Sequence, residues 1–321
     1  MKVDNSTVEA FRRKLDEAGM TKLSSELRFE EIMKPHTSFR VGGPAQVYAE
    51  PSDTKELAAL LSAATSVDMP YLLMGNGSNL VISDEGIDGL VIRLGEKFSE
   101  ITSEEDPKDP DHVLVRASAG TLLTKLSSFA AKNSLTGLEF ASGIPGSVGG
   151  AVFMNAGAYD HDMSEVLESV ISITPSGEIV TWKKEDLDLG YRSSVFMKKG
   201  GIVAEAVLKL SRGDEEAIRE QIRTYTEKRT KSQPLNFPSA GSMFKRPTGY
   251  YTGALIEQAG LKGFSIGGAQ VSEKHAGFVI NTGNATAADI DALVSHIQAT
   301  IREKNNVELQ REVRFIGRGF N

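Results

Sequence analysis

The chain has 321 residues, with 36 lysines and arginines against 43 aspartates and glutamates, a formal net charge of -7. It contains no cysteine, which excludes disulfides, cysteine-ligated zinc and iron–sulfur clusters. The acidic balance without a basic block argues against a nucleic-acid partner. We expect no metal site and no membrane insertion, and we expect a cytoplasmic location.

In chain order, the pattern predicts a helical segment over residues 1–21, alternating strands and short helices over 22–212, and a smaller α+β part over 213–321. The clearest expected helices and strands are helices at 55–65 and 121–133 and strands at 89–94, 113–117, 170–174 and 202–210. We expect a polar surface loop at 100–111, whose sequence includes two prolines.

The C-terminal part begins with a charged helical stretch over residues 211–231, which a proline-rich run at 233–238 ends. Thr286 is the expected N-cap of a helix that runs to about Asn305. A final strand is expected over 307–316, with Glu312 on its polar face.

Two runs of small residues are the most informative feature of the sequence. The first is GNGSNL at residues 75–80, and the second is GIPGSVGGAVFMNAGAY at residues 143–159. Glycine lets backbone amides approach an anion closely, and serine adds a hydroxyl donor. Either run alone could be a tight turn, but two together favour one extended ligand with phosphates.

The common nucleotide motifs do not match these runs. Leu80 stands where the dinucleotide fingerprint requires glycine or alanine, and no phosphate-binding G-x-x-x-x-G-K-[ST] occurs. The sequence therefore argues against a Rossmann domain and against a P-loop enzyme.

Three polar residues are candidates for chemistry. Arg192 lies among turn residues and could clamp a carboxylate or phosphate, although an ion-paired surface arginine is an equal alternative. Ser242 and Lys245 have the S-x-x-K spacing of penicillin-interacting serine hydrolases, but Pro247 follows at once and the partner motifs of that class are absent. Glu312, taken alone, is a solvent-facing strand residue.

Six motifs in order resemble the UDP-N-acetylenolpyruvoylglucosamine reductase family over nearly the whole chain. They are TSFRVGGPA at 37–45, GNGSNL at 75–80, the run at 143–159, GYRSSVF at 190–196, GSMFKRP at 241–247 and NVELQREVRFIG at 306–317. The chain is similar to the shorter subclass of this family, without an inserted tyrosine loop.

The resemblance implies a non-Rossmann FAD-binding fold of the vanillyl-alcohol-oxidase type. Two α+β subdomains, meeting near residues 95–112, would hold FAD, and residues 213–321 would form an α+β substrate-binding domain. The cofactor-binding positions carried over from the family are Arg40, Gly75, Asn76, Gly77, Ser78, Asn79, Leu80, Ser142, Gly143, Ile144, Gly146, Ser147, Gly149, Gly150, Asn155 and Ile202.

The resemblance also implies the reaction and its residues. Hydride from NADPH would pass through FAD to the enolpyruvyl ether of UDP-N-acetylglucosamine and give UDP-N-acetylmuramate for the bacterial cell wall. Ser242 would donate the proton, Arg192 and Glu312 would polarise the carboxylate, and Tyr159, Arg192 and Lys245 would bind the substrate.

Two other functions remain open at this point. A flavin-dependent oxidase of the same fold would reduce oxygen instead, although such enzymes commonly tether FAD through histidine or cysteine, and neither glycine-rich run contains one. A non-catalytic flavin-binding protein would leave Arg192, Ser242 and Glu312 without a role. The sequence leaves the oligomeric state and the choice between NADPH and NADH undetermined.

Overall fold

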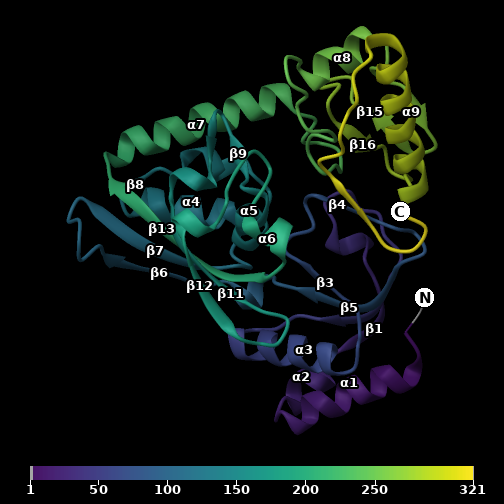
Figure 1. The fold of residues 1–321 in the computed structure, drawn as a ribbon. Coiled ribbons are helices and arrows are strands. Elements are labelled where there is room, and N and C mark those ends of the chain that lie inside the picture. The colour runs from purple at the N-terminus through teal and green to yellow at the C-terminus, as the bar shows by residue number, and fades with distance from the viewer. Residues whose placement is uncertain (1–2, 321) are drawn as a thin grey trace. The chain divides into compact units, whose positions relative to one another are not determined.

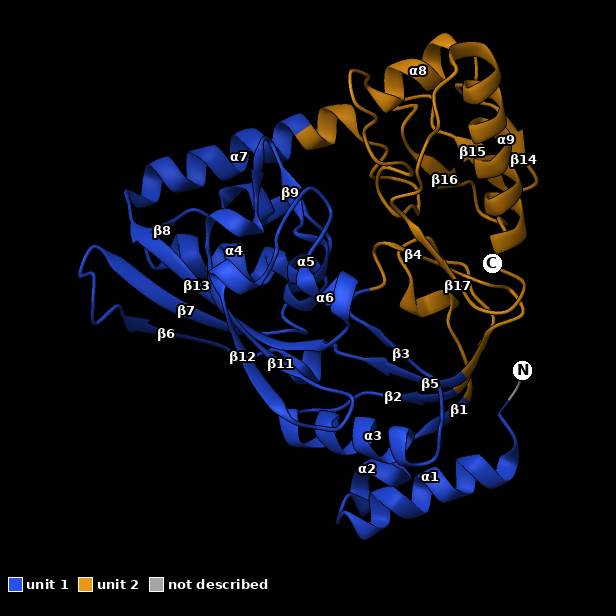
Figure 2. Cartoon of the chain, viewed as in Figure 1, with its two compact units in different colours: residues 1–29, 47–76, 89–228 blue, residues 30–46, 77–88, 229–321 orange. Residues whose placement is uncertain are grey.

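The computed structural model describes residues 3–320, which form two compact units (Figure 2). Unit 1 comprises residues 1–29, 47–76 and 89–228, and unit 2 comprises residues 30–46, 77–88 and 229–321. The expected domains are continuous stretches of sequence that divide after residues 21 and 212, and they stay a prediction. The two units are defined by which residues contact one another in the structure.

The elements are labelled in Figure 1. The α-helices are α1 (Asn5–Glu17), α2 (Thr21–Ser25), α3 (Thr54–Ser66), α4 (Leu123–Lys132), α5 (Val148–Met154), α6 (Val195–Lys199), α7 (Glu215–Ser232), α8 (Thr252–Gln258) and α9 (Ala287–Asn305). Short 3-10 helices are η1 (Lys34–His36), η2 (Glu96–Phe98), η3 (Glu139–Gly143), η4 (Met163–Glu165) and η5 (Lys184–Asp186).

The first strands are β1 (Arg28–Ile32), β2 (Pro44–Ala49), β3 (Tyr71–Met74), β4 (Leu80–Ile82), β5 (Ile87–Arg93), β6 (Ile101–Glu105), β7 (His112–Ser118), β8 (Leu135–Thr136) and β9 (Gly157–Ala158). They are followed by β10 (His161–Asp162), β11 (Leu167–Ile173), β12 (Ile179–Lys183), β13 (Ile202–Arg212), β14 (Ser265–Ile266), β15 (Ala269–Val271), β16 (Val279–Asn281) and β17 (Arg314–Ile316).

Unit 1 contains a six-stranded sheet in the order β12-β11-β13-β7-β6, with β8 on β13, and its pairs are antiparallel. A second sheet has the order β1-β2-β5-β3, in which β3 and β5 are parallel. The expected strands β5, β7, β11 and β13 and helices α3 and α4 are confirmed, with ends shifted by a few residues. The expected mixed α+β class is therefore confirmed.

Two expectations about the chain were wrong. The stretch 100–111 is not all loop, because β6 pairs with β7 as the end strand of its sheet. An edge strand with exposed side chains tolerates charged residues, which is why its sequence resembled a loop. The final strand is shorter than expected: only Arg314–Ile316 forms β17, parallel to β4, while Phe244 and Arg311 form an isolated bridge.

Each unit has a hydrophobic core of its own. The unit 1 core includes Phe11 and Leu15 of α1, both fully buried, with α1 packed on α3. Complete burial of a side chain of this size contributes about 1.5–3 kcal/mol. The unit 2 core forms around the apolar face of α9, including Leu293 and Ile297. These separate cores explain why the chain divides into two units.

Helix α9 begins at the cap that the sequence predicted. The Thr286 side chain accepts from Asp289 N–H, and the Asp289 side chain accepts from Thr286 N–H. Asp84, which follows β4, accepts from the N–H groups of Ala287 and Ala288 at 2.9 and 3.0 Å. The cap is therefore confirmed, and a second carboxylate from another part of unit 2 reinforces it.

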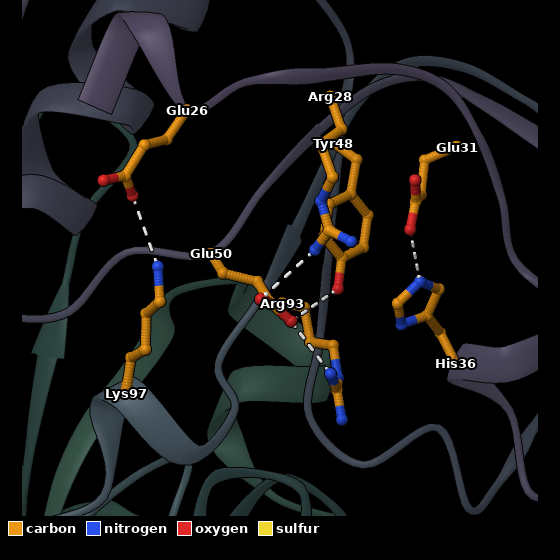
Figure 3. A network of polar contacts seen from close by, with 8 residues as sticks. All are labelled: Glu26, Arg28, Glu31, His36, Tyr48, Glu50, Arg93 and Lys97. Carbon is orange, nitrogen blue, oxygen red and sulfur yellow. Dashed lines mark hydrogen bonds and ion pairs between the residues drawn. The ribbon is translucent and has the colours of Figure 1, made fainter. Parts of the chain in front are cut away.

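A partly buried polar network joins the ends of β2 and β5 in unit 1 (Figure 3). The Tyr48 hydroxyl donates to Glu50 at 2.7 Å, and the Arg93 guanidinium donates to Glu50 at 2.8 Å. Arg28 lies 3.2 Å from Glu50 and 4.3 Å above the Tyr48 ring. Burial alone would raise the pKa of Glu50, but hydrogen bonds from Tyr48 and Arg93 outweigh it and lower that pKa.

Replacing Glu50 by glutamine is expected to lower the free energy of unfolding by about 2–3 kcal/mol. The change leaves Arg93 and Arg28 without their shared anion, and the expected loss is below that for a fully buried pair because Glu50 and Arg93 are 23% and 27% exposed. Urea denaturation checks this value. The Glu26→Gln control, which breaks the exposed pair with Lys97, should cost less than about 1 kcal/mol. Equal losses in the two variants would contradict the account.

Candidate functional site

The two glycine-rich runs meet in unit 1. The Asn76 carboxamide donates to the Pro145 carbonyl at 2.7 Å, which ties the first run to the second. Gly75 lies so close to Ser147 that a Cβ at Gly75 would collide with the Ser147 hydroxyl oxygen. A side chain at Gly75 would therefore force the Ser147 hydroxyl to move, and residues 75 and 76 of the first run lie directly against the second run.

The second run is also hydrogen-bonded to the segment that contains Ala119 and Thr121. The N–H groups of Val148 and Gly149 donate to the carbonyls of Thr121 and Ala119, each at 2.8 Å. A Cβ at Gly149 would lie 2.8 Å from the Ala119 Cβ, so this glycine packs against protein. Gly150 is exposed, which leaves this part of the run accessible.

The remaining unit 1 candidates surround the end of α5. Asn155 is the left-handed C-cap of α5 and is 2% exposed. Tyr159 also has positive φ, and its hydroxyl donates to the Tyr225 carbonyl at 2.8 Å. Arg192 donates to the Gly157 carbonyl at 3.2 Å. Ile202 begins β13 and is 6% exposed.

Four further candidates lie just before α5 in the chain. The Ser142 hydroxyl donates to the Glu139 carbonyl at 2.8 Å within η3, directly before the second run. Gly143, Ile144 and Gly146 are partly exposed and lie between this serine and the α5 helix.

Unit 2 holds the rest of the first glycine run beside Glu312. The Asn79 carboxamide donates to the Glu312 carbonyl at 3.1 Å, and Asn79 O accepts from Arg314 N–H at 3.0 Å. On its other side, Glu312 N–H donates to the Met243 carbonyl at 2.9 Å. The backbone of Glu312 is thus held between the Asn79 side chain and the segment that carries Ser242.

That segment lies between two others in unit 2. Met243 N–H donates to the Gly277 carbonyl, and Ser242 forms an antiparallel bridge with Phe278. Lys245 N–H donates to the Gln310 carbonyl at 2.9 Å. The Ser242 side chain is exposed while Met243 is fully buried. The backbone of Ser242 is therefore fixed, and its hydroxyl faces outward.

Gly77, Ser78 and Arg40 complete the unit 2 candidates. Gly77 has positive φ, and its carbonyl accepts from Ser38 N–H at 3.2 Å. Arg40 has left-handed φ with an exposed side chain, and its N–H donates to the Thr37 carbonyl. Unit 2 therefore brings Gly77, Asn79, Ser242, Lys245 and Glu312 into one hydrogen-bonded region, while Arg192 belongs to unit 1.

Two family models match this chain. Residues 45–183 match the model of an FAD binding domain, and residues 233–316 match that of the UDP-N-acetylenolpyruvoylglucosamine reductase C-terminal domain. The reductase of Clostridium tetani is 49% identical over 92% of this chain and 93% of its own. The chain belongs to the UDP-N-acetylenolpyruvoylglucosamine reductase family.

Other members of the reductase family show the same extent of similarity. The reductase of Agathobacter rectalis is 48% identical, covering 90% of this chain and 93% of its own. The solved reductase structure from Thermus caldophilus is 36% identical, with a TM-score of 0.75, and the match covers 90% of this chain and 99% of that one. The resemblance drawn from the six motifs is confirmed.

The FAD binding domain match contains both glycine-rich runs, and the C-terminal domain match contains Ser242, Lys245 and Glu312. Arg40, Arg192 and Ile202 lie outside both matched ranges. Within residues 3–320, no helix is both long and apolar enough to cross a bilayer.

Tyr225 is a site neighbour that the sequence reasoning missed. Its ring stacks on Tyr159 with centroids 4.1 Å apart and planes 3° apart. Tyr225 lies on α7, seven residues after the buried Ile218 of the same helix. This helical spacing on an otherwise charged helix is the signal that could have identified the inner face.

His275 makes the stability of unit 2 depend on pH. Burial lowers its pKa, and its Nδ1 accepts from Gly277 N–H at 3.1 Å. The folded state favours the neutral His275 ring. Its contribution to the free energy of unfolding is therefore complete above the ordinary pKa of histidine, which applies to the unfolded chain. That contribution is lost as the pH falls from this ordinary pKa toward the lower pKa of the folded state.

We therefore expect the wild-type unfolding temperature to decrease more steeply than that of His275→Asn between about pH 8 and about pH 5. Asparagine can still accept from the amide two residues ahead, so the turn is preserved. Thermal unfolding followed by circular dichroism at several pH values checks this expectation. Parallel pH profiles for the two proteins would contradict it.

Proposed function

We propose that Ser242, Arg192 and Glu312 carry out the reduction of the enolpyruvyl ether of UDP-N-acetylglucosamine to UDP-N-acetylmuramate. Family membership makes the protein an NADPH-dependent FAD oxidoreductase of peptidoglycan precursor synthesis. The observation that carries the residue assignment is the pair of hydrogen bonds on Glu312, which link it to Asn79 of the first glycine run and to Met243 beside Ser242. A cytoplasmic location fits this role.

The residues of the glycine-rich runs fit FAD. Residues 75–82 and 142–158 contain no charged side chain, so no carboxylate opposes the pyrophosphate. Their small side chains leave amide, hydroxyl and carboxamide groups as the donors. Asn76, Gly146 and Gly150 are the positions that we assign to holding the pyrophosphate. When bound, FAD supplies hydride transfer from NADPH.

The protein groups supply charge and a proton. Hydride addition to the terminal carbon of the enol ether places negative charge on the adjacent carbon and the carboxylate. The Arg192 guanidinium is always charged and planar, so it is suited to bind that carboxylate through two hydrogen bonds. In this proposal Glu312 also binds the substrate carboxylate, and Lys245 binds the nucleotide part of the substrate.

Ser242 completes the reaction in this proposal. Its hydroxyl donates a proton to the carbon next to the carboxylate after hydride addition. Serine is a weak acid in water. Ser242 can therefore speed the protonation only because its hydroxyl is held in a fixed position next to the carbanion. Its strand-like hydrogen bonds on both sides support that role, because they fix the backbone while leaving the side chain outward.

An anaerobic turnover assay tests the proposal. The purified protein with FAD is expected to oxidise more than one equivalent of NADPH per flavin only when the enol ether is present, with mass spectrometry detecting a product that has gained two hydrogen atoms. NADPH oxidation that requires oxygen and leaves the enol ether unchanged would instead support the flavin-dependent oxidase.

A further inference from the structure

Arg192 lies at the tip of a short turn that unit 1 holds at both ends. Gly190 N–H donates to the Ser193 carbonyl and Ser193 N–H donates to the Gly190 carbonyl, each at 3.1 Å. This closes a two-residue turn of Tyr191 and Arg192, and Arg192 has a left-handed φ of 51°. The direction of the guanidinium therefore depends on how this turn is fixed.

The end of α5 fixes the turn at three points. The Asn155 carboxamide donates to the Gly190 carbonyl at 3.1 Å, before the turn. The Ser194 hydroxyl, fully buried, donates to the Phe153 carbonyl at 2.7 Å, after the turn. The Arg192 guanidinium itself donates to the Gly157 carbonyl at 3.2 Å.

All hydrogen-bonding groups of the Asn155 carboxamide have protein partners. Its nitrogen donates to Gly190 and to Asp162 Oδ2, each at 3.1 Å, and its oxygen accepts from Ser164 N–H at 3.0 Å. A carboxamide has two N–H donors, and both are used here. Both donors of the Asn155 side chain are therefore committed to protein groups, and one of these holds the carbonyl at the start of the turn.

We propose that Asn155 and Ser194 are positioning residues that aim Arg192 at the substrate carboxylate. The inference rests on the proposed function of Arg192. It also connects two parts of the site, because α5 and the residues directly after it belong to the second glycine-rich run and carry the contacts that hold the turn. A displacement of about 1 Å in such a group can cost a hundredfold in rate.

The test uses Asn155→Gly and Ser194→Ala in the full-length protein with FAD. Glycine keeps the left-handed C-cap and removes only the carboxamide. Ser172→Ala is the matched control, because Ser172 is also a buried serine of unit 1 with a side-chain hydrogen bond, from Trp182. We expect kcat for enol ether reduction to fall about tenfold to a hundredfold in both test variants and to stay unchanged in the control.

The same variants are then made in an Arg192→Ala background. If Asn155 and Ser194 act through Arg192, they should have no further effect on kcat there, while the rate of anaerobic flavin reduction by NADPH stays at the wild-type value throughout. An equal loss in both backgrounds, or a loss of bound FAD in Asn155→Gly, would overturn the positioning role. Absence of enol ether reduction by the wild-type protein would overturn the proposed function itself.

Discussion

Replacement of Ser242 by alanine is expected to lower kcat for enol ether reduction by about 10²–10⁴-fold, the range for removal of a positioned general acid. The Ser242 side chain is exposed, while its segment is hydrogen-bonded to residues on both sides, so the backbone should not move. The rate at which NADPH reduces the flavin should stay unchanged, because that step requires no proton from Ser242.

Rapid-mixing measurements of the two half-reactions check this result. The matched control is Ser265→Ala, which removes an exposed serine hydroxyl from β14 of the same unit and should leave both rates unchanged. Wild-type rates of enol ether reduction in Ser242→Ala would contradict the proton-donor role. An equal slowing of both half-reactions would point to a general disturbance of the site instead.

Replacement of Arg192 by lysine is expected to lower kcat/KM for the enol ether by about 10²–10³-fold, as does removal of a group that stabilises developing charge. Lysine keeps the charge but lacks the planar pair of donors that a carboxylate requires. It also loses the contact with the Gly157 carbonyl that holds the guanidinium. Arginine and lysine have the same backbone strain at the left-handed φ of position 192. A difference in kcat/KM between the two enzymes therefore reports on the side chain alone.

Steady-state kinetics with the enol ether as the varied substrate measures this loss. Arg116→Lys serves as the control, because Arg116 of β7, 40% exposed, makes ion pairs with Glu104 and Glu205 in the same unit. Such pairs contribute little, so the control should match the wild type. An Arg192→Lys enzyme with wild-type kcat/KM would remove Arg192 from the proposed catalytic set.

Local signals in the sequence were sufficient for much of the fold. The Thr286 cap and the apolar spacing behind it predicted α9 to its last residue, because both signals lie within the helix itself. By contrast, β6 was read as a loop because an exposed edge strand lacks the alternation that marks a half-buried one. The final strand was overextended because its length depends on β4, far away in the chain.

The candidate site also has features that the local sequence predicts and features that only the folded chain shows. The glycine-rich runs predicted a phosphate-binding surface from composition, and the structure adds the Asn76 contact that joins them. The hydrogen bond from Asn79 to Glu312 spans 233 residues, so no local pattern could reveal it. The partners of the Asn155 carboxamide, which are Gly190, Asp162 and Ser164, likewise come together only in the folded chain.

The most direct test of the account is the visible spectrum of the purified protein, recorded without oxygen while NADPH and then UDP-N-acetylglucosamine enolpyruvate are added. The account predicts flavin absorbance that bleaches with NADPH and returns when the enol ether is added. Absorbance that returns only when air is admitted, or a protein that cannot be reconstituted with FAD, would contradict it.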